Sequence, residues 1–288
     1  HRIMSTAKKL NFYTAGHIPF QVGLDGVLSE GMDEIAHIEE LLWEFSDVDR
    51  QRYFESEGEW MTYVIRQTFR QLKPYLELGP QDRDRRLDDM VAPVVRKLKG
   101  RDMPVCTTLV VDDVIVQKLF EPDLFLRKPE IRYMPNGYRE RVLAGKEKHQ
   151  RQFKGGEVFA PFKYALDKKL LANFKDMGLP LLLSTDAGTG GMGIVPGFSL
   201  HDELEILVEN GFSPYEAIAA GTTVASKVVA RMKGQDSFGV ILPGKRADLI
   251  LLKQNPLKDV SNTRKISGVM AAGRWYDEEA LAGFLDKL

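Results

Sequence analysis

The chain has 288 residues, and its 43% hydrophobic and 28% charged side chains match soluble globular averages, which excludes disordered, collagen-like and fibrous classes. Forty basic side chains face 41 acidic ones, so the net charge of −1 predicts no general affinity for nucleic acid or for an anionic membrane. The single cysteine, Cys106, excludes a disulfide within the chain, and no apolar run approaches the ~20 residues of a membrane helix.

The start of the chain predicts a helix and two short buried strands. Apolar side chains recur at helical spacing over residues 3–10. The segments 12–17 and 34–37 are largely apolar and end at His17 and His37, respectively. We therefore expect each of these strands to deliver a histidine at its carboxyl end.

The middle of the chain alternates between helical and strand patterns. Residues 43–103 predict a highly charged helical insertion with amphipathic stripes. The β-branched run 104–111 predicts a strand, and residues 160–177 predict a helix. A further apolar strand is expected over 180–186, where it ends at Asp186.

The next part of the chain predicts helices with recognisable N-terminal capping residues. Ser199 is expected to cap one helix, and Ser213 with Glu216 predicts a capping box that has Pro214 at the first helical position. Another helix is expected over 222–232.

Alternating strands and helices predict an α/β fold with a parallel sheet, as in a (β/α)₈ barrel. The last fifty or so residues change to short strands and tight turns. We therefore expect two units: a barrel part over 1–235, with its insertion at 43–103, and a small β unit with the C-terminal segment over 236–288.

Three polar residues stand at predicted strand ends, where barrel enzymes carry their active residues. Imidazole and carboxylate groups suit zinc and similar divalent ions, so His17, His37 and Asp186 are candidate metal ligands. Each residue taken alone also has a simpler interpretation. A strand-end histidine is often a hydrogen-bonded core residue, and an aspartate before glycines can cap a turn.

Longer segments around these residues carry a family resemblance. They are 15–19, 33–39, 184–188, 196–204, 211–218 and 239–250. In this order and spacing the sequence resembles the amidohydrolase superfamily, and within it the imidazolonepropionase-related and Xaa-Pro dipeptidase-like branch. The resemblance is tight at the start and over the last ~110 residues, whereas 43–175 matches only in the order of elements.

The resemblance implies a (β/α)₈ barrel that holds one or two divalent ions, zinc before others, beside a small β-sandwich. His17 and His37 match the metal-binding histidines of the family's fifth and sixth strands, and 104–111 takes the place of the seventh. Asp186 matches the eighth-strand aspartate, which binds metal and accepts a proton from the attacking water.

The chain departs from the family pattern at its beginning. Family members carry a His-x-His pair on the first strand, and this branch often carries a carboxylated lysine on the fourth. None of the five histidines here form such a pair. We therefore expect a C-terminal portion of an amidohydrolase, inactive by itself. The missing N-terminal half of the barrel, or a second copy in a homo-oligomer, would cover the open strands. The cellular location is left open.

Other polar residues have competing interpretations. His201 could approach the site, although packing within its helix is the simpler expectation. Arg132 and Tyr138 could grip a substrate carboxylate from the segment 132–139, which could equally be a solvated loop. His149 lies in a charged run and is expected to be solvated.

The sequence therefore predicts a metal-dependent hydrolase of carbon–nitrogen bonds in a small amide, lactam or dipeptide, acting through a metal-activated water. The alternative is a non-catalytic or split fragment that serves assembly or binding. Substrate and metal identity stay open, because the loops of this fold select the substrate.

Overall fold

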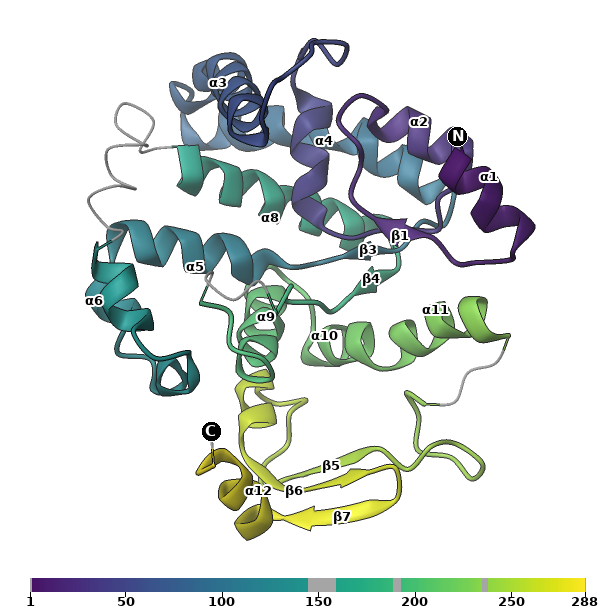
Figure 1. Ribbon diagram of the computed structural model, residues 1–288, viewed down its shortest axis with the longest axis vertical. Coiled ribbons are helices and arrows are strands. Elements are labelled where there is room, and N and C mark those ends of the chain that lie inside the picture. The colour runs from purple at the N-terminus through teal and green to yellow at the C-terminus, as the bar shows by residue number, and fades with distance from the viewer. Residues whose placement is uncertain (1, 145–158, 189–192, 235–237, 288) are drawn as a thin grey trace.

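Four short parallel strands form the centre of the fold, in the order β1-β2-β3-β4 (Figure 1). The computed structural model describes residues 2–144, 159–188, 193–234 and 238–287. Helices connect successive strands, which is the α/β arrangement expected for the C-terminal part of a (β/α)₈ barrel. The elements are α1 (Arg2–Lys9), β1 (Ala15–Gly16), α2 (Gly23–Glu30), β2 (Glu34–Ile35), η1 (Ile38–Phe45), α3 (Glu57–Leu76), α4 (Pro80–Lys99), β3 (Val105–Cys106), α5 (Leu109–Phe120), α6 (Pro122–Phe125), η2 (Pro129–Tyr133), α8 (Phe159–Met177), β4 (Leu181–Leu182), α9 (Phe198–Glu209), α10 (Pro214–Gly221), α11 (Thr223–Lys233), β5 (Leu249–Leu252), η3 (Val260–Arg264), β6 (Ile266–Ala271), β7 (Arg274–Asp277) and α12 (Glu278–Leu285).

The register of the parallel sheet brings its carboxyl ends to one edge. Gly16, Ile35, Val105 and Leu181 pair in a single row across the four strands. The residues that come after this row in each strand therefore emerge on the same side of the sheet, where the candidate site residues are found.

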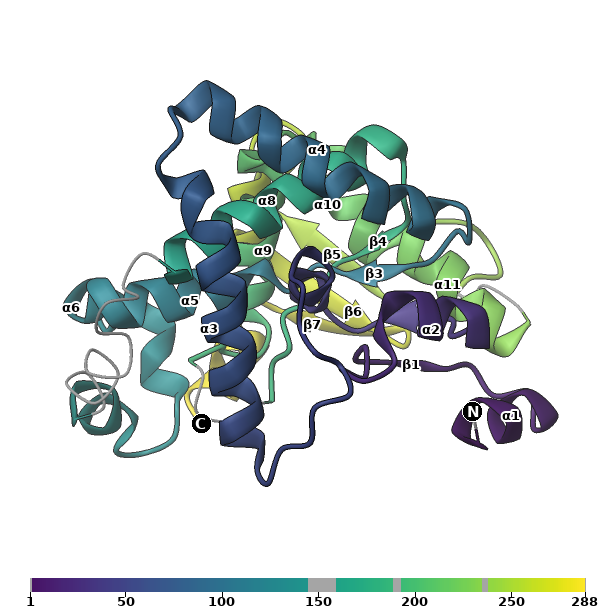
Figure 2. The ribbon, with the colours of Figure 1, turned by 90° about the horizontal axis from the view of Figure 1, so that it is seen from above.

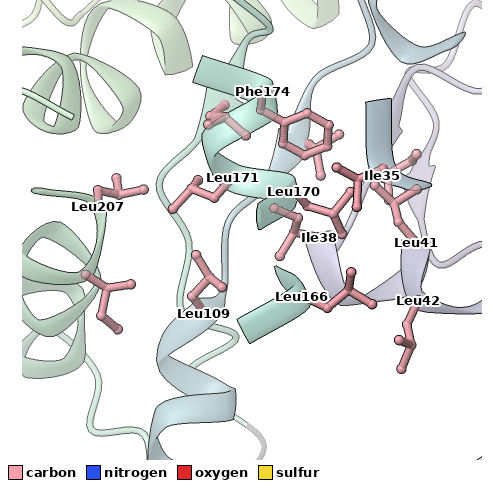
Figure 3. Close-up of a cluster of buried hydrophobic side chains, with 14 of the residues drawn as sticks. Ile35, Ile38, Leu41, Leu42, Leu109, Leu166, Leu170, Leu171, Phe174 and Leu207 are labelled. Atoms are coloured by element: carbon pink, nitrogen blue, oxygen red, sulfur yellow. The ribbon is translucent and has the colours of Figure 1, made fainter. Parts of the chain in front are cut away.

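Leucines and isoleucines from several helices pack on the sheet and form the main core (Figure 3). In α8, Leu166, Leu170 and Phe174 recur every four residues and are fully buried, because this spacing places them on one helix face. They meet Ile35 of β2 and Leu41 of η1. Removing each such side chain from water contributes about 1.5–3 kcal/mol, so this layer anchors the strands.

The charged segment 43–103 is helical, as expected, and supplies α3 and α4. α4 packs against α8, and α3 contacts α4 and η1 (Figure 2). None of the described helices is long and apolar enough to span a membrane.

The strands are shorter than the sequence predicts, and β3 is the clearest case. The expected strand 104–111 is only Val105–Cys106, and α5 already begins at Leu109. Thr108 has a φ of 49°, which turns the chain out of the sheet. Buried Glu203 then accepts hydrogen bonds from the first amides of α5, so β-branched composition is overruled by a cap from another helix.

The expected cap at Ser199 is wrong, whereas the one at Ser213 is confirmed. α9 begins at Phe198 after Gly197, and the Ser199 hydroxyl accepts from the amide of Val195 instead. At α10, Ser213 and Glu216 form the complete capping box with Pro214 at the helix start.

A separate three-stranded antiparallel sheet, β5-β6-β7, comes after the helices in the chain. It lies beyond α9 in Figure 1, in yellow. Arg264 of η3 joins the two parts through its ion pair with Glu205 of α9, at 3.0 Å. The expected boundary near 235 falls at residues outside the described ranges, so the division at that position stays a proposal.

Candidate active site

The structure brings His17 and His37 together at the carboxyl edge of the parallel sheet. His17 directly follows β1, and His37 lies two residues beyond β2. Their ring centroids are 4.9 Å apart, with 44° between the planes. The His17 side chain is 68% exposed, whereas His37 is buried. The two histidines are separated in sequence, and the pairing of neighbouring parallel strands brings them close together.

The Nδ1 atom of each imidazole contacts a side chain of the protein. His17 Nδ1 lies 2.7 Å from Glu40 Oε1, and His37 Nδ1 lies 3.3 Å from the hydroxyl of Thr108. These contacts leave Nε2 as the nitrogen through which each ring could bind a metal ion.

A buried carboxylate fixes the turn that carries Thr108. Glu203 of α9 is fully buried and accepts from the amides of Leu109 and Val110 at 3.1 and 2.7 Å. Burial raises the pKa of Glu203 to about 7, against the opposing effect of hydrogen bonds from Thr107 and the two amides. Sequence reasoning missed this role, because Glu203 and Leu109 are 94 positions apart in the chain.

Asp186 follows β4 by four residues and is exposed at the same edge. Its φ of 53° lies in the left-handed region, which is uncommon for a residue other than glycine. The amide of Thr108 donates to the carbonyl oxygen of Ser184, at 3.2 Å, and ties the ends of β3 and β4 together. The roles assigned to Asp186 stay predictions.

The donor chemistry of the histidine pair fits a divalent metal in part. A carboxylate or hydroxyl on the far nitrogen of a metal-binding histidine fixes its orientation, as Glu40 and Thr108 do here. Across the described ranges, however, no group of three or more His, Cys, Asp and Glu side chains is arranged to hold a metal ion. Zinc sites use three or four protein ligands, so the pair fits two positions and leaves the others open.

A cluster of charged side chains near this site was also not predicted from the sequence. Lys163 Nζ contacts Glu39 at 3.0 Å, Asp112 at 2.7 Å and Asp167 at 2.8 Å. Burial alone would lower the pKa of Lys163, but Asp167, Asp112 and Glu39 raise it well above its usual value. Burial also raises the pKa of Asp167. The sequence signal was the four-residue spacing of Lys163 and Asp167 on one helix.

The other predicted site residues lie in different surroundings. His201 Nδ1 is 2.8 Å from the hydroxyl of Thr263 in η3, and burial lowers the pKa of His201. Arg132 is exposed, with its guanidinium carbon 4.7 Å from the ring centre of Tyr133. Tyr133 in turn stacks on Phe198 at the start of α9, with centroids 5.2 Å apart. His149 lies outside the described residues.

Tyr138 is buried, and burial raises its pKa to about 12. Its hydroxyl has no hydrogen-bond partner within the described part of the chain. It packs beside Phe125 and against Gly193, where any Cβ would collide with the hydroxyl. Tyr138 therefore packs closely against the backbone at Gly193.

The surroundings of Cys106 indicate a structural role. Its Sγ lies 3.4 Å from Glu34 Oε1, and burial together with that carboxylate raises the thiol pKa to about 12. A thiol of this kind stays protonated near neutral pH and is a poor nucleophile.

A parallel sheet with helical connections, and with imidazoles at its carboxyl edge, is the arrangement expected of part of a (β/α)₈ barrel. Residues 167–276 match the amidohydrolase family. Together with the fold, this match confirms the resemblance of the chain to the amidohydrolase superfamily.

Solved structures share this fold at low sequence identity. An amidohydrolase is 19% identical with a TM-score of 0.55, and the match covers 96% of this chain and 47% of that one. A Xaa-Pro dipeptidase with methionine bound in its active site is 18% identical with a TM-score of 0.54 and the same coverages. For the ochratoxinase of A. niger the values are 16% identity, a TM-score of 0.55, and 96% and 44% coverage. This chain thus spans about half the length of these structures. No curated protein matches it.

Proposed function

We propose that this chain is part of a metal-dependent hydrolase of carbon–nitrogen bonds in small amides, lactams or dipeptides. The observation that carries the proposal is the pair of imidazoles 4.9 Å apart at the carboxyl edge of the sheet, each engaged at Nδ1. The family match over 167–276 supports the reaction class, because that segment contains Asp186.

In this proposal His17 and His37 hold a divalent ion, zinc before others, and Asp186 reaches the same or a neighbouring ion. One or two ions fit the superfamily. A bound ion would lower the pKa of a water molecule towards ~7 and polarise the carbonyl of the substrate. The Asp186 carboxylate takes the proton of the attacking water and passes it to the leaving nitrogen.

Substrate contact is assigned to Arg132, with His201 and Tyr138 as further proposed contacts. The Arg132 guanidinium is exposed and lies over the Tyr133 ring, and its Nη2 donates to the Tyr133 hydroxyl. In the proposal its other donors bind a substrate carboxylate. Two of the similar solved structures each hold a small molecule, which is methionine in one and N-methylphosphonate-L-proline in the other. They support a small amide or dipeptide as the substrate class.

The open strands of the sheet are part of the proposal. Among the described elements, β1 and β4 each pair on one side only. We propose that the N-terminal half of a barrel, or a second copy of this chain, flanks them and completes the ligand set.

A non-catalytic role in assembly or binding is the second candidate. It is favoured by the incomplete ligand set within the described residues. In that case the histidine pair would be a remnant without a metal.

Zinc content and hydrolysis of a dipeptide panel test the proposal. In the assembly that completes its ligand set, the wild-type protein should retain zinc after dialysis, and His17→Ala and His37→Ala should each lose most of it. His201→Ala should keep its zinc, because His201 bonds to Thr263. Zinc retained by the variant that combines His17→Ala and His37→Ala would contradict the assignment. A complete assembly that neither holds zinc nor hydrolyses any dipeptide would favour the second candidate.

A further inference from the structure

One carboxylate joins the loops that follow β1 and β2. Glu40 belongs to η1, three residues after His37, and its side chain is only 14% exposed. Its Oε1 lies 2.7 Å from His17 Nδ1, and its Oε2 accepts from the amide of Ile18 at 3.1 Å. Glu40 therefore holds both the ring and the backbone of the neighbouring strand end.

The chemistry of these two bonds fixes one form of the imidazole. A carboxylate only accepts hydrogen bonds, so the hydrogen of a neutral His17 must reside on Nδ1. Nε2 then carries the lone pair, which is the state that a metal ligand requires. A glutamine cannot replace both bonds, because it offers one acceptor oxygen while two donors, Nδ1–H and the Ile18 amide, face the side chain.

The two residues before Glu40 fix its position at the start of η1. Ile38 is 1% exposed and sits in the core, whereas Glu39 points the other way and contacts Lys163 at 3.0 Å. The start of η1 is thus pinned to the core and to α8, which leaves Glu40 facing His17. His37 has a weaker arrangement, since its Nδ1 meets the neutral hydroxyl of Thr108 at 3.3 Å.

We propose that Glu40 is a positioning residue that holds His17 in its Nδ1–H form and aims Nε2 at the site shared with His37. This inference rests on the proposed function, since it assigns the purpose of that orientation to metal binding. Partners of this kind typically change metal affinity by about 10- to 100-fold when they are removed.

The test uses Glu40→Gln with Glu44→Gln as the matched control. Glu44 lies in the same η1 segment and is similarly buried, at 12% exposure. It also accepts from a nearby amide, that of Leu24, and its other partner is Arg50 rather than an imidazole. Both variants should remain folded, as checked by thermal unfolding, because the replacement is nearly isosteric.

The first measurement is the tautomer of His17 in the metal-free protein, from imidazole nitrogen NMR shifts assigned with His17→Gln. Wild type and Glu44→Gln should show the Nδ1–H form, and Glu40→Gln should show a mixture or the Nε2–H form. The second is zinc affinity, which should fall about 10- to 100-fold in Glu40→Gln and stay within about twofold of wild type in Glu44→Gln.

The two readouts separate the inference from the function on which it rests. A wild-type His17 in the Nε2–H form, or an unchanged tautomer in Glu40→Gln, overturns the role of Glu40 whatever the zinc result. An equal loss of zinc affinity in both variants also overturns it, because any loop anchor would then suffice. The expected tautomers together with no zinc binding in the assembly that completes the ligand set would refute the proposed function and support only the Nδ1–H part of the inference.

Discussion

The buried carboxyl of Glu203 should make the folded protein less stable as the pH rises. Its pKa is about 7 in the folded state, compared with an ordinary value of 4.5. A proton therefore binds more tightly to the folded chain, so stability is fullest below pH 4.5 and declines as the pH rises to about 7. At 1.36 kcal/mol per pH unit, the full difference corresponds to about 3 kcal/mol, of which about 2.5 kcal/mol falls between pH 5 and pH 8.

Glu203→Gln removes the titration and keeps the size of the side chain. Urea unfolding of wild type and variant at pH 5, 6, 7 and 8 gives the difference in unfolding free energy at each pH. Subtracting the unfolding free energy of the wild type from that of the variant cancels the effect of titrating groups that both proteins share. The remaining difference should change by about 2.5 kcal/mol in favour of the variant as the pH rises. The absolute offset also contains the loss of one acceptor at the amides of Leu109 and Val110. A difference that is flat between pH 5 and pH 8 would show that these hydrogen bonds outweigh burial, and would refute the reasoning.

Two further substitutions test the surroundings of the site. Lys163→Met should lower the unfolding free energy by about 3 kcal/mol, because Asp112, Asp167 and Glu39 lose their common cation; a loss below about 1 kcal/mol in urea would contradict this. In the active protein, Asp186→Asn should reduce turnover by about 10²–10⁴-fold, the usual contribution of a general base, and near-normal turnover at unchanged metal content would remove Asp186 from the mechanism.

The sequence was informative where short-range patterns decide the structure. Helical spacing predicted α1, α8 and α11, and the capping box at Ser213 is present as expected. The alternation of strands and helices predicted the parallel sheet, which in turn placed His17 and His37 at one edge. That step succeeded because parallel strands put their carboxyl ends on one side, whatever the length of the connections.

The groups that support the site could not be predicted in this way, because their partners are remote in sequence. Glu203 caps α5 across 94 positions of sequence, and Lys163 reaches Glu39 across 124. The predicted strand lengths were wrong for a related reason. Composition favoured a strand up to residue 111, whereas the left-handed turn at Thr108 depends on contacts that only the folded chain supplies.

The edge of the sheet is held by charged side chains as much as by the strands themselves. Each of β1 to β4 has only two residues, so the ladder alone gives little rigidity to the loops at its carboxyl end. Glu40 joins the ends of β1 and β2, Glu203 joins the end of β3 to α9, and Lys163 joins η1, α5 and α8. A working site would need its side chains within about 0.5 Å of their productive positions, and these three links restrain the loops at this edge. A homologous chain that kept the strand-end motifs but lost these links would therefore retain the signature of the site without its geometry.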